Sequence, residues 1–199
     1  MGKVEENKRQ KEEKLFQTAF NLFSTKGINN TAIKDIVDIA GVGKGTFYLY
    51  FKDKYDIRDK LIVKKTSELF QKAIEDYLKE DISNFDDEVI FIVNHIIDEL
   101  SQDKLLLKMI SRNLSWGIYK KVLNSTDKKS SYSYYDLFME SSRRQNIKFK
   151  NAEVLLFIII EMVGSTCYSS ILLNQPVSIE DLKPHLYDSI KATLKSGRE

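Results

Sequence analysis

Residues 31–54, TAIKDIVDIAGVGKGTFYLYFKDK, contain the pattern on which the predicted fold rests. Four apolar residues at the three- and four-residue spacing of one helix face predict a first short helix: Ile33, Ile36, Val37 and Ala40. Thr31 is placed to cap this helix, and Gly41 is placed to end it. A second short helix is predicted from Gly43 to Phe51. Two short helices joined by a glycine turn are typical of a helix-turn-helix, whose second helix faces DNA.

The segments on either side extend this pattern into an all-α fold of about nine helices. Residues 8–26 predict an amphipathic helix that ends at Gly27, and residues 55–78 predict a long helix of about 35 Å. Further helical patterns include residues 85–101, 151–174 and 179–195. We expect a three-helix helix-turn-helix domain over residues 1–54 and a helical effector-binding and dimerisation domain over residues 55–199.

Composition agrees with a helical protein. The 199 residues include only two prolines and eight glycines, and 42% of them are apolar, which is enough for a sizeable core. One cysteine excludes an intramolecular disulfide framework and suits a reducing compartment. The amino terminus has no apolar signal segment, and the longest apolar run, residues 154–160, is far shorter than a membrane span of roughly 20 residues. We therefore expect a cytoplasmic protein with no membrane partner.

The helix predicted at residues 151–174 is apolar around nearly its whole circumference. Such a helix has to be covered on all sides, and in a chain of this size a second subunit is the natural cover. We predict that the last two helices form a homodimer interface. Its predicted residues are Leu156, Ile160, Val163, Cys167, Leu182, Leu186 and Ile190.

Residues 12–60 closely resemble the TetR (tetracycline repressor) family of bacterial transcription regulators. The matching positions are Gly27, Thr31, Ile36, Ala40-Gly41-Val42, Gly45-Thr46, Tyr48, Tyr50-Phe51 and Lys54. The resemblance implies a homodimer that binds a palindromic operator in double-stranded DNA. It also implies a regulator, more often a repressor, that a small-molecule effector releases from DNA.

Carried onto this sequence, the resemblance assigns roles to nine residues. Thr31 and Lys34 would lie near a phosphate strand, and Lys44, Thr46 and Tyr48 would enter the major groove. Tyr50 and Lys54 would hold the flanking backbone, while Gly43 and Gly45 permit close backbone approach. The sequence departs from the family at Gly43, where a serine is common, so the hydroxyl contact to phosphate is absent.

The groove-facing set contains no arginine, asparagine or glutamine, the side chains best suited to bidentate base pairing. Base readout should therefore be sparse, with Lys44 contacting guanine and Thr46 or Tyr48 contacting thymine methyl groups. DNA shape would supply part of the specificity.

Two interpretations stay open for a group of large side chains in the second half of the chain. They line a cavity for a small apolar or amphipathic effector, or they are ordinary core residues. The group consists of Met109, Trp116, Tyr119, Phe138 and Met162.

The same sequence argues against two other functions and leaves a third open. The stretch GVGKGT fails as a nucleotide-binding loop because Lys44 is followed by Gly45 and position 38 is aspartate. The chain has no Glu-x-x-His pair and no Cys/His cluster, so we predict no catalytic residue, metal or cofactor and regard an enzyme as the weaker alternative. The remaining alternative is an architectural or occlusion DNA-binding protein of the same fold that needs no effector.

Overall fold

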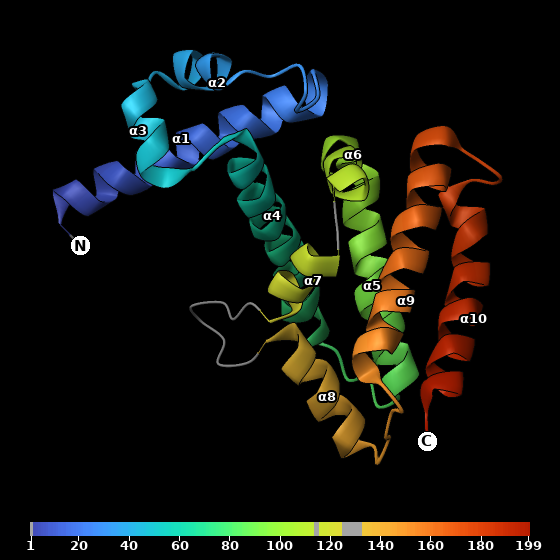
Figure 1. Ribbon diagram of the computed structural model, residues 1–199. Coiled ribbons are helices and arrows are strands. Elements are labelled where there is room, and N and C mark those ends of the chain that lie inside the picture. Colours follow the sequence, from blue (N-terminus) through green and yellow to red (C-terminus); the bar gives the residue numbers. More distant parts are fainter. Residues whose placement is uncertain (1, 114–115, 125–132) are drawn as a thin grey trace. The chain divides into compact units, whose positions relative to one another are not determined.

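The computed structural model describes residues 2–113, 116–124 and 133–199. Within these residues the chain forms ten α-helices and one π-helical segment (Figure 1), and an isolated β-bridge joins Phe149 and Arg198. The helices are α1 (Lys3–Thr25), α2 (Ile33–Ala40), α3 (Lys44–Tyr50), α4 (Lys54–Tyr77), α5 (Phe85–Gln102), α6 (Lys104–Asn113), α7 (Trp116–Leu123), α8 (Tyr134–Arg144), α9 (Ala152–Cys167), the π-helix η1 (Tyr168–Leu172) and α10 (Ile179–Gly197). The predicted all-α class is confirmed.

The chain divides into two compact units, residues 1–65 and residues 66–199. The division falls inside α4, so this one helix belongs to both units. The boundary predicted between residues 54 and 55 lies at the start of α4. The assignment of DNA binding to residues 1–54 and of effector binding and dimerisation to residues 55–199 stays a prediction.

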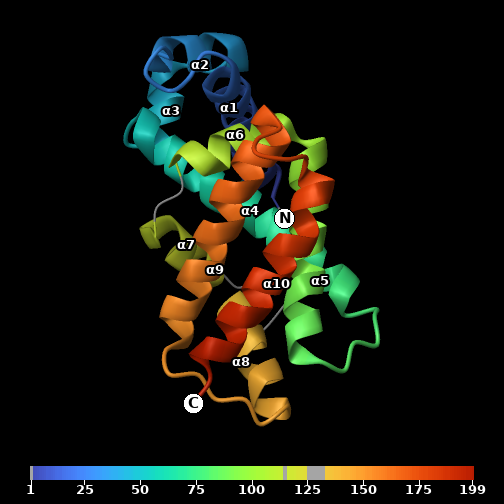
Figure 2. The same cartoon turned by 90° about the vertical axis from the view of Figure 1, so that its right-hand side faces the viewer.

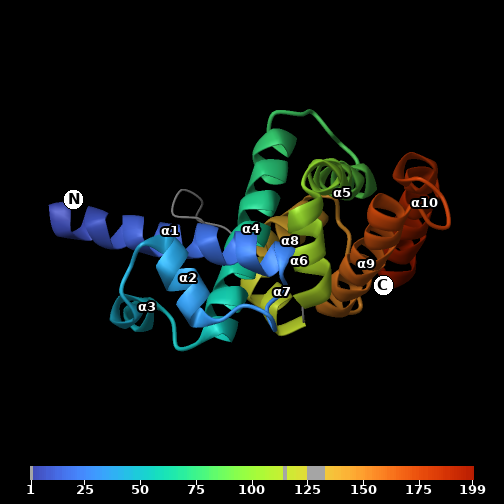
Figure 3. The ribbon, with the colours of Figure 1, turned by 90° about the horizontal axis from the view of Figure 1, so that it is seen from above.

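The first unit is built on the buried face of α1. In this unit α2 packs against α1 and α3 against α2 (Figure 3). The rings of Phe16 and Phe51 meet edge to face at 5.1 Å, and Phe47 lies 5.4 Å from Phe51. Gly27 and Gly41 have φ values of +80° and +66°, the left-handed conformation expected after a helix end.

The predicted capping of α2 by Thr31 is wrong. The N-cap residue is Ala32, whose backbone N–H donates to the Asp35 side chain at 3.0 Å. Thr31 is buried, and its hydroxyl donates to the carbonyl oxygen of Gly27 at 2.8 Å. Because the turn directs the Thr31 hydroxyl inward, the capping hydrogen bond is made instead by the side chain of Asp35, the third residue of the helix.

The second unit has its main core between α5, α9 and α10, and Figure 2 shows α9 and α10 side by side. The buried members of this core are Phe85, Val93, Ile97, Leu155, Ile159, Val163, Cys167, Leu186, Ile190 and Leu194. The helix predicted over residues 151–174 is α9 followed by η1. By length and composition alone, the stretch Ala152–Leu172 could cross a membrane, but a core helix of a soluble protein passes the same test.

Candidate DNA-binding surface and ligand cavity

Helix α3 buries one face and exposes the other. Phe47 is fully buried, as is Phe51 just after the helix. On the opposite side Lys44 and Gly45 are exposed, and the side chain of Tyr48 is 51% exposed. Thr46 is half-buried. The structure therefore brings Lys44 and Tyr48, one turn apart, onto one accessible face of α3.

Leu49 is a member of this face that the sequence-based set omitted. Its side chain is 81% exposed, the largest value among the exposed large apolar residues of the described chain. The sequence pattern could have predicted this exposure. Phe47 and Phe51 define the buried face, and residue 49 lies about 200° from residue 47 around a helix. Leu49 adds an aliphatic group beside Tyr48.

Gly43 and Gly45 have no packing role among the residues that the structure describes. Gly43 is the N-cap of α3, with an extended backbone and no side-chain cap. A Cβ added at Gly45 would meet no atom within 4 Å, and one added at Gly43 would meet only the Thr46 hydroxyl at 4.0 Å. Neither φ value lies in the left-handed region, so the fold itself does not require glycine at either position.

Lys34 lies on the exposed side of α2, where its ammonium group is 3.2 Å from the Asp38 carboxylate. Both side chains are largely exposed, so this pair contributes little to stability. The ammonium group of Lys34 is free to turn towards a phosphate.

Three other predicted contact residues are engaged inside the first unit. The Lys54 ammonium group donates to the carbonyl oxygens of Ile28, Asn29 and Thr31. The Tyr50 hydroxyl donates to the carbonyl oxygen of Lys8 at 3.1 Å. Thr31 has a buried side chain and offers no group to a partner, which corrects its assignment as a phosphate contact.

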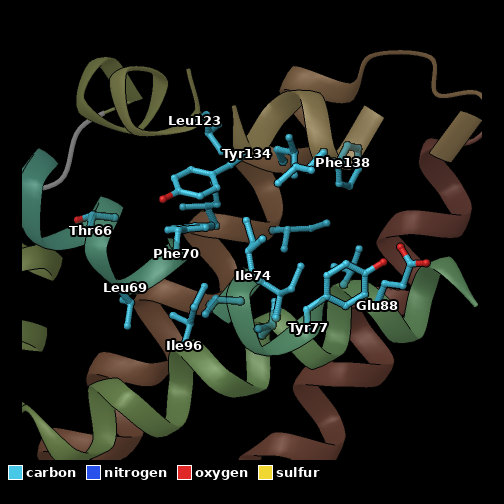
Figure 4. Close-up of a pocket in the computed structure, with 18 of the residues that line it drawn as sticks. Thr66, Leu69, Phe70, Ile74, Tyr77, Glu88, Ile96, Leu123, Tyr134 and Phe138 are labelled. Atoms are coloured by element: carbon cyan, nitrogen blue, oxygen red, sulfur yellow. The ribbon is translucent and has the colours of Figure 1, made fainter. Parts of the chain in front are cut away.

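The second unit encloses a cavity of about 310 Å³ between α4, α5, α6, α7, α8 and α9 (Figure 4). Most of its lining is apolar, and its aromatic members are Phe70, Tyr77, Phe85, Tyr119, Tyr134 and Phe138. Tyr119 and Phe138 of the predicted effector group line this cavity. Met109 is buried outside the lining and Met162 packs on the main core, so neither contributes; the side chain of Trp116 lies outside the described residues.

One end of the cavity is polar. Glu88 on α5 is only 6% exposed, and its carboxylate accepts hydrogen bonds from the Ser141 hydroxyl and, at 3.1 Å, from the Gln145 amide. Figure 4 shows the Tyr77 hydroxyl pointing towards this carboxylate. Burial and the neighbouring Glu88 charge raise the pKa of Tyr77, and the Arg144 guanidinium acts in the opposite direction. The phenol therefore stays neutral beside a buried charge.

Four of the seven predicted dimer-interface residues, Val163, Cys167, Leu186 and Ile190, are buried in the chain's own core, which corrects their assignment. The other three, Leu156, Ile160 and Leu182, are half-buried, and their place in a dimer interface stays a prediction. Leu156 and Ile160 line the cavity. The sequence correctly predicted an apolar helix. It did not show which faces of that helix are covered by the same chain, because all of its faces are apolar. The exposed apolar residues of α9 are Val154, Phe157 and Ile158.

Cys167 lies at 0% exposure, and burial raises the pKa of its thiol to about 12. A neutral, inaccessible thiol behaves as a small apolar group. His95 is half-buried, and its Nδ1 lies 3.5 Å from Asp76. Among the residues that the structure describes, no group of three or more metal-ligating side chains could hold an ion.

The fold and the accessible face of α3 define an all-helical protein with an amino-terminal helix-turn-helix. Residues 15–61 match the family model for bacterial regulatory proteins of the tetR family. Residues 15–61 therefore form a helix-turn-helix of this TetR family.

Relatives in Bacillus subtilis support this assignment. The uncharacterised helix-turn-helix regulator YvdT is 50% identical over 44 residues, which cover 22% of this chain and 23% of that protein. The regulator YfiR is 25% identical over 150 residues, covering 71% and 66%, and a fatty acid metabolism regulator protein is 33% identical over 69 residues, covering 35% and 36%. The chain thus matches less than two thirds of the length of each of these three relatives.

Solved structures share the fold over nearly the whole chain. A structure assigned to the TetR family from Syntrophomonas wolfei has a TM-score of 0.73 at 21% identity, covering 94% of this chain and 96% of the other. FadR from Bacillus subtilis, solved in complex with stearoyl-CoA, has a TM-score of 0.65 at 19% identity, covering 89% and 96%. At these identities the likeness concerns the fold alone.

Proposed function

We propose that this protein is a cytoplasmic homodimer that binds a palindromic DNA operator and represses transcription until a small amphipathic effector releases it. The observation that carries the DNA-binding part is the face of α3. Lys44, Tyr48 and Leu49 are exposed there, opposite a side that Phe47 anchors in the core. A short helix held rigidly on one side and accessible on the other is what a major groove admits.

Gly45 supports the same conclusion. A glycine that is needed neither for backbone conformation nor for internal packing leaves room for something outside the protein. At Gly45 that partner would be the DNA backbone near the start of α3. Lys34 would neutralise a phosphate, and Lys44 would reach a guanine edge.

Dimerisation would use the exposed apolar side chains of α9 together with the neighbouring surface of α10. Val154 and Ile158 are large and apolar, and they are 49% and 44% exposed in the single chain. A two-fold pairing of this surface would present two α3 helices to two half-sites.

The cavity would supply effector control. It lies in the second unit against α4, and α4 continues into the first unit. A ligand that prefers one position of α4 would therefore change the presentation of the helix-turn-helix. The structural likeness to FadR in complex with stearoyl-CoA and the match to a fatty acid metabolism regulator suit a ligand with a long apolar chain.

A footprint on the DNA flanking the coding region, repeated at rising salt, tests the proposal. We expect a protected palindrome, and one phosphate-neutralising lysine per protomer, Lys34, gives a slope of log K against log salt of about −2. Lys44→Ala and Tyr48→Ala should abolish protection in folded protein, whereas the surface control Lys195→Ala should bind normally. The absence of any protected sequence at low salt would overturn the proposal.

The effector-independent alternative is tested separately. If no ligand raises the melting temperature of the protein or weakens the footprint, the chain acts by occupancy of DNA alone.

A further inference from the structure

One wall of the cavity is a face of helix α4. Four of its lining residues, Thr66, Phe70, Ile74 and Tyr77, follow one face of α4 at spacings of four, four and three. The rise of an α-helix places Thr66 and Tyr77 about 16 Å apart along its axis. A ligand with one unbranched hydrocarbon chain of similar length can lie along this row of side chains.

The two ends of this row of side chains differ in exposure. At the Tyr77 end, Leu78, Glu140 and Arg144 all line the cavity and are exposed to solvent. At the other end Thr66 and Leu69 are buried. Figure 4 shows Thr66 and Glu88 at opposite ends of the lining. A chain-like ligand would therefore enter tail first and keep its head group near Tyr77 and Glu88.

The charges at the open end decide which head group fits. Among the described lining residues three are charged, the carboxylates of Glu88 and Glu140 and the guanidinium of Arg144, so their sum is −1. Glu88 is the buried one, and a carboxylate in a poorly solvated place interacts strongly with any charge brought near it. An anionic head group would be repelled by two carboxylates and attracted only by Arg144, whereas a cation would be attracted by both carboxylates and repelled only by Arg144.

Aromatic rings near Glu88 also favour a cationic head group. Tyr77, Phe85 and Phe138 all line the cavity, and the rings of Phe85 and Phe138 pack edge to face at 5.1 Å. Ring faces attract an ammonium group most strongly where water is scarce.

We propose that the cavity binds a single-chain amphiphile with an ammonium head group, which lies beside Glu88 while the tail extends along α4 towards Thr66. The proposal rests on the proposed function in assigning this ligand the effector role. Binding to the cavity itself is measured without DNA, so a failed footprint and a failed ligand experiment are distinguishable.

The test uses three ligands with the same tail of about twelve carbons, a length that matches the row of about 16 Å from Thr66 to Tyr77. They are dodecylammonium, dodecanol and dodecanoate, titrated calorimetrically into the full-length protein below their aggregation concentrations. We expect dodecylammonium to bind at least about tenfold more tightly than dodecanoate, with dodecanol between them. Tighter binding of dodecanoate, equal binding of all three, or no binding of any would overturn the proposal.

Variants assign the preference to Glu88. Glu88→Gln should reduce the preference for dodecylammonium over dodecanoate to about one. The control Glu180→Gln, on the exposed surface of α10, should leave the preference unchanged. Arg144→Gln removes the competing positive charge at the exposed mouth, so it should increase dodecylammonium affinity even if Glu88→Gln fails to fold. An unchanged preference in folded Glu88→Gln, or weaker dodecylammonium binding in Arg144→Gln, would also overturn the proposal.

Discussion

The Nζ atom of Lys54 lies 2.8 Å from the carbonyl oxygen of Ile28, and it also donates to the carbonyl oxygens of Asn29 at 3.3 Å and Thr31 at 3.2 Å. All three N–H groups of the ammonium are therefore used within the protein. The first residue of α4 is tied to the loop before α2, and this link fixes one side of the helix-turn-helix. The resemblance to the family placed Lys54 on the DNA backbone, but its geometry is that of a structural residue.

Lys54→Met should accordingly destabilise the first unit. Hydrogen bonds that involve a charged group each contribute about 1.5–3 kcal/mol, so we expect a loss of about 2 kcal/mol after the loop relaxes. Hydrogen exchange of amides in α2 measures this loss. DNA affinity should fall while the salt slope stays near its original value, because no phosphate contact is removed. The comparison variant Lys34→Ala should leave the stability of the first unit unchanged. It should reduce the magnitude of the slope of log K against log salt by about 2 in the dimer.

Gly43→Ser should strengthen both α3 and DNA binding. Gly43 has an extended backbone at the N-cap, and an added Cβ would meet only the Thr46 hydroxyl at 4.0 Å. A serine there can accept a hydrogen bond from the N–H of Thr46 and donate to a phosphate, which glycine cannot do. We expect a stability gain of a few tenths of a kcal/mol and a several-fold gain in affinity. Gly43→Ala is the control, and equal affinities of the serine and alanine variants would show that no hydroxyl contact forms.

The parts of this protein that the sequence predicted correctly depend on near neighbours. Phe47 and Phe51 define the buried side of α3 by their spacing, and Gly41 marks the end of α2 by its residue type. The internal partners of Lys54 and Tyr50 could not be found in this way, because they lie 26 and 42 residues away. Only the folded chain brings these groups together.

Helix α9 shows a second limit of prediction from sequence. Its residues are apolar on nearly every side, yet Cys167 is fully buried while Ile158 is 44% exposed. Hydrophobic periodicity cannot separate a face that the same chain covers from one that a partner covers, because both require apolar side chains. The cavity lining was predicted only for Tyr119 and Phe138, since its walls come from six helices.

Leu49 should read thymine methyl groups. Its exposed aliphatic side chain has no donor or acceptor, so its favourable base contact in the major groove is the thymine C5 methyl group. We expect that replacing single thymines of a selected operator by uracil, which removes only this methyl group, weakens binding by about 1 kcal/mol at one position per half-site. In Leu49→Ala the same substitution should have no effect. Uracil-insensitive binding of the unaltered protein would refute this role.

Thr66→Val should stabilise the second unit. The Thr66 hydroxyl is buried in the cavity wall and has no hydrogen-bond partner among the described residues. Valine has nearly the same shape without the polar group, so the variant avoids a desolvation cost of about 1 kcal/mol. Thermal unfolding measures the gain. Thr66→Ser retains the hydroxyl and loses a methyl group, so this control should be less stable than the original protein.

Ile158→Glu should separate the proposed dimer. Ile158 and Leu105 are apolar residues of similar exposure, 44% and 40%, but Ile158 lies on α9 and Leu105 on α6. A buried, unpaired carboxylate at each two-fold related position of an α9 interface is strongly unfavourable, so Ile158→Glu should sediment as a monomer at micromolar concentration. Leu105→Glu carries the same change outside that surface and should remain dimeric. Because a single helix-turn-helix contacts only one half-site, the monomeric variant should also lose its footprint while its folded helix content is retained. If Ile158→Glu stays dimeric and Leu105→Glu does not, the dimer surface is centred on α6 instead of α9.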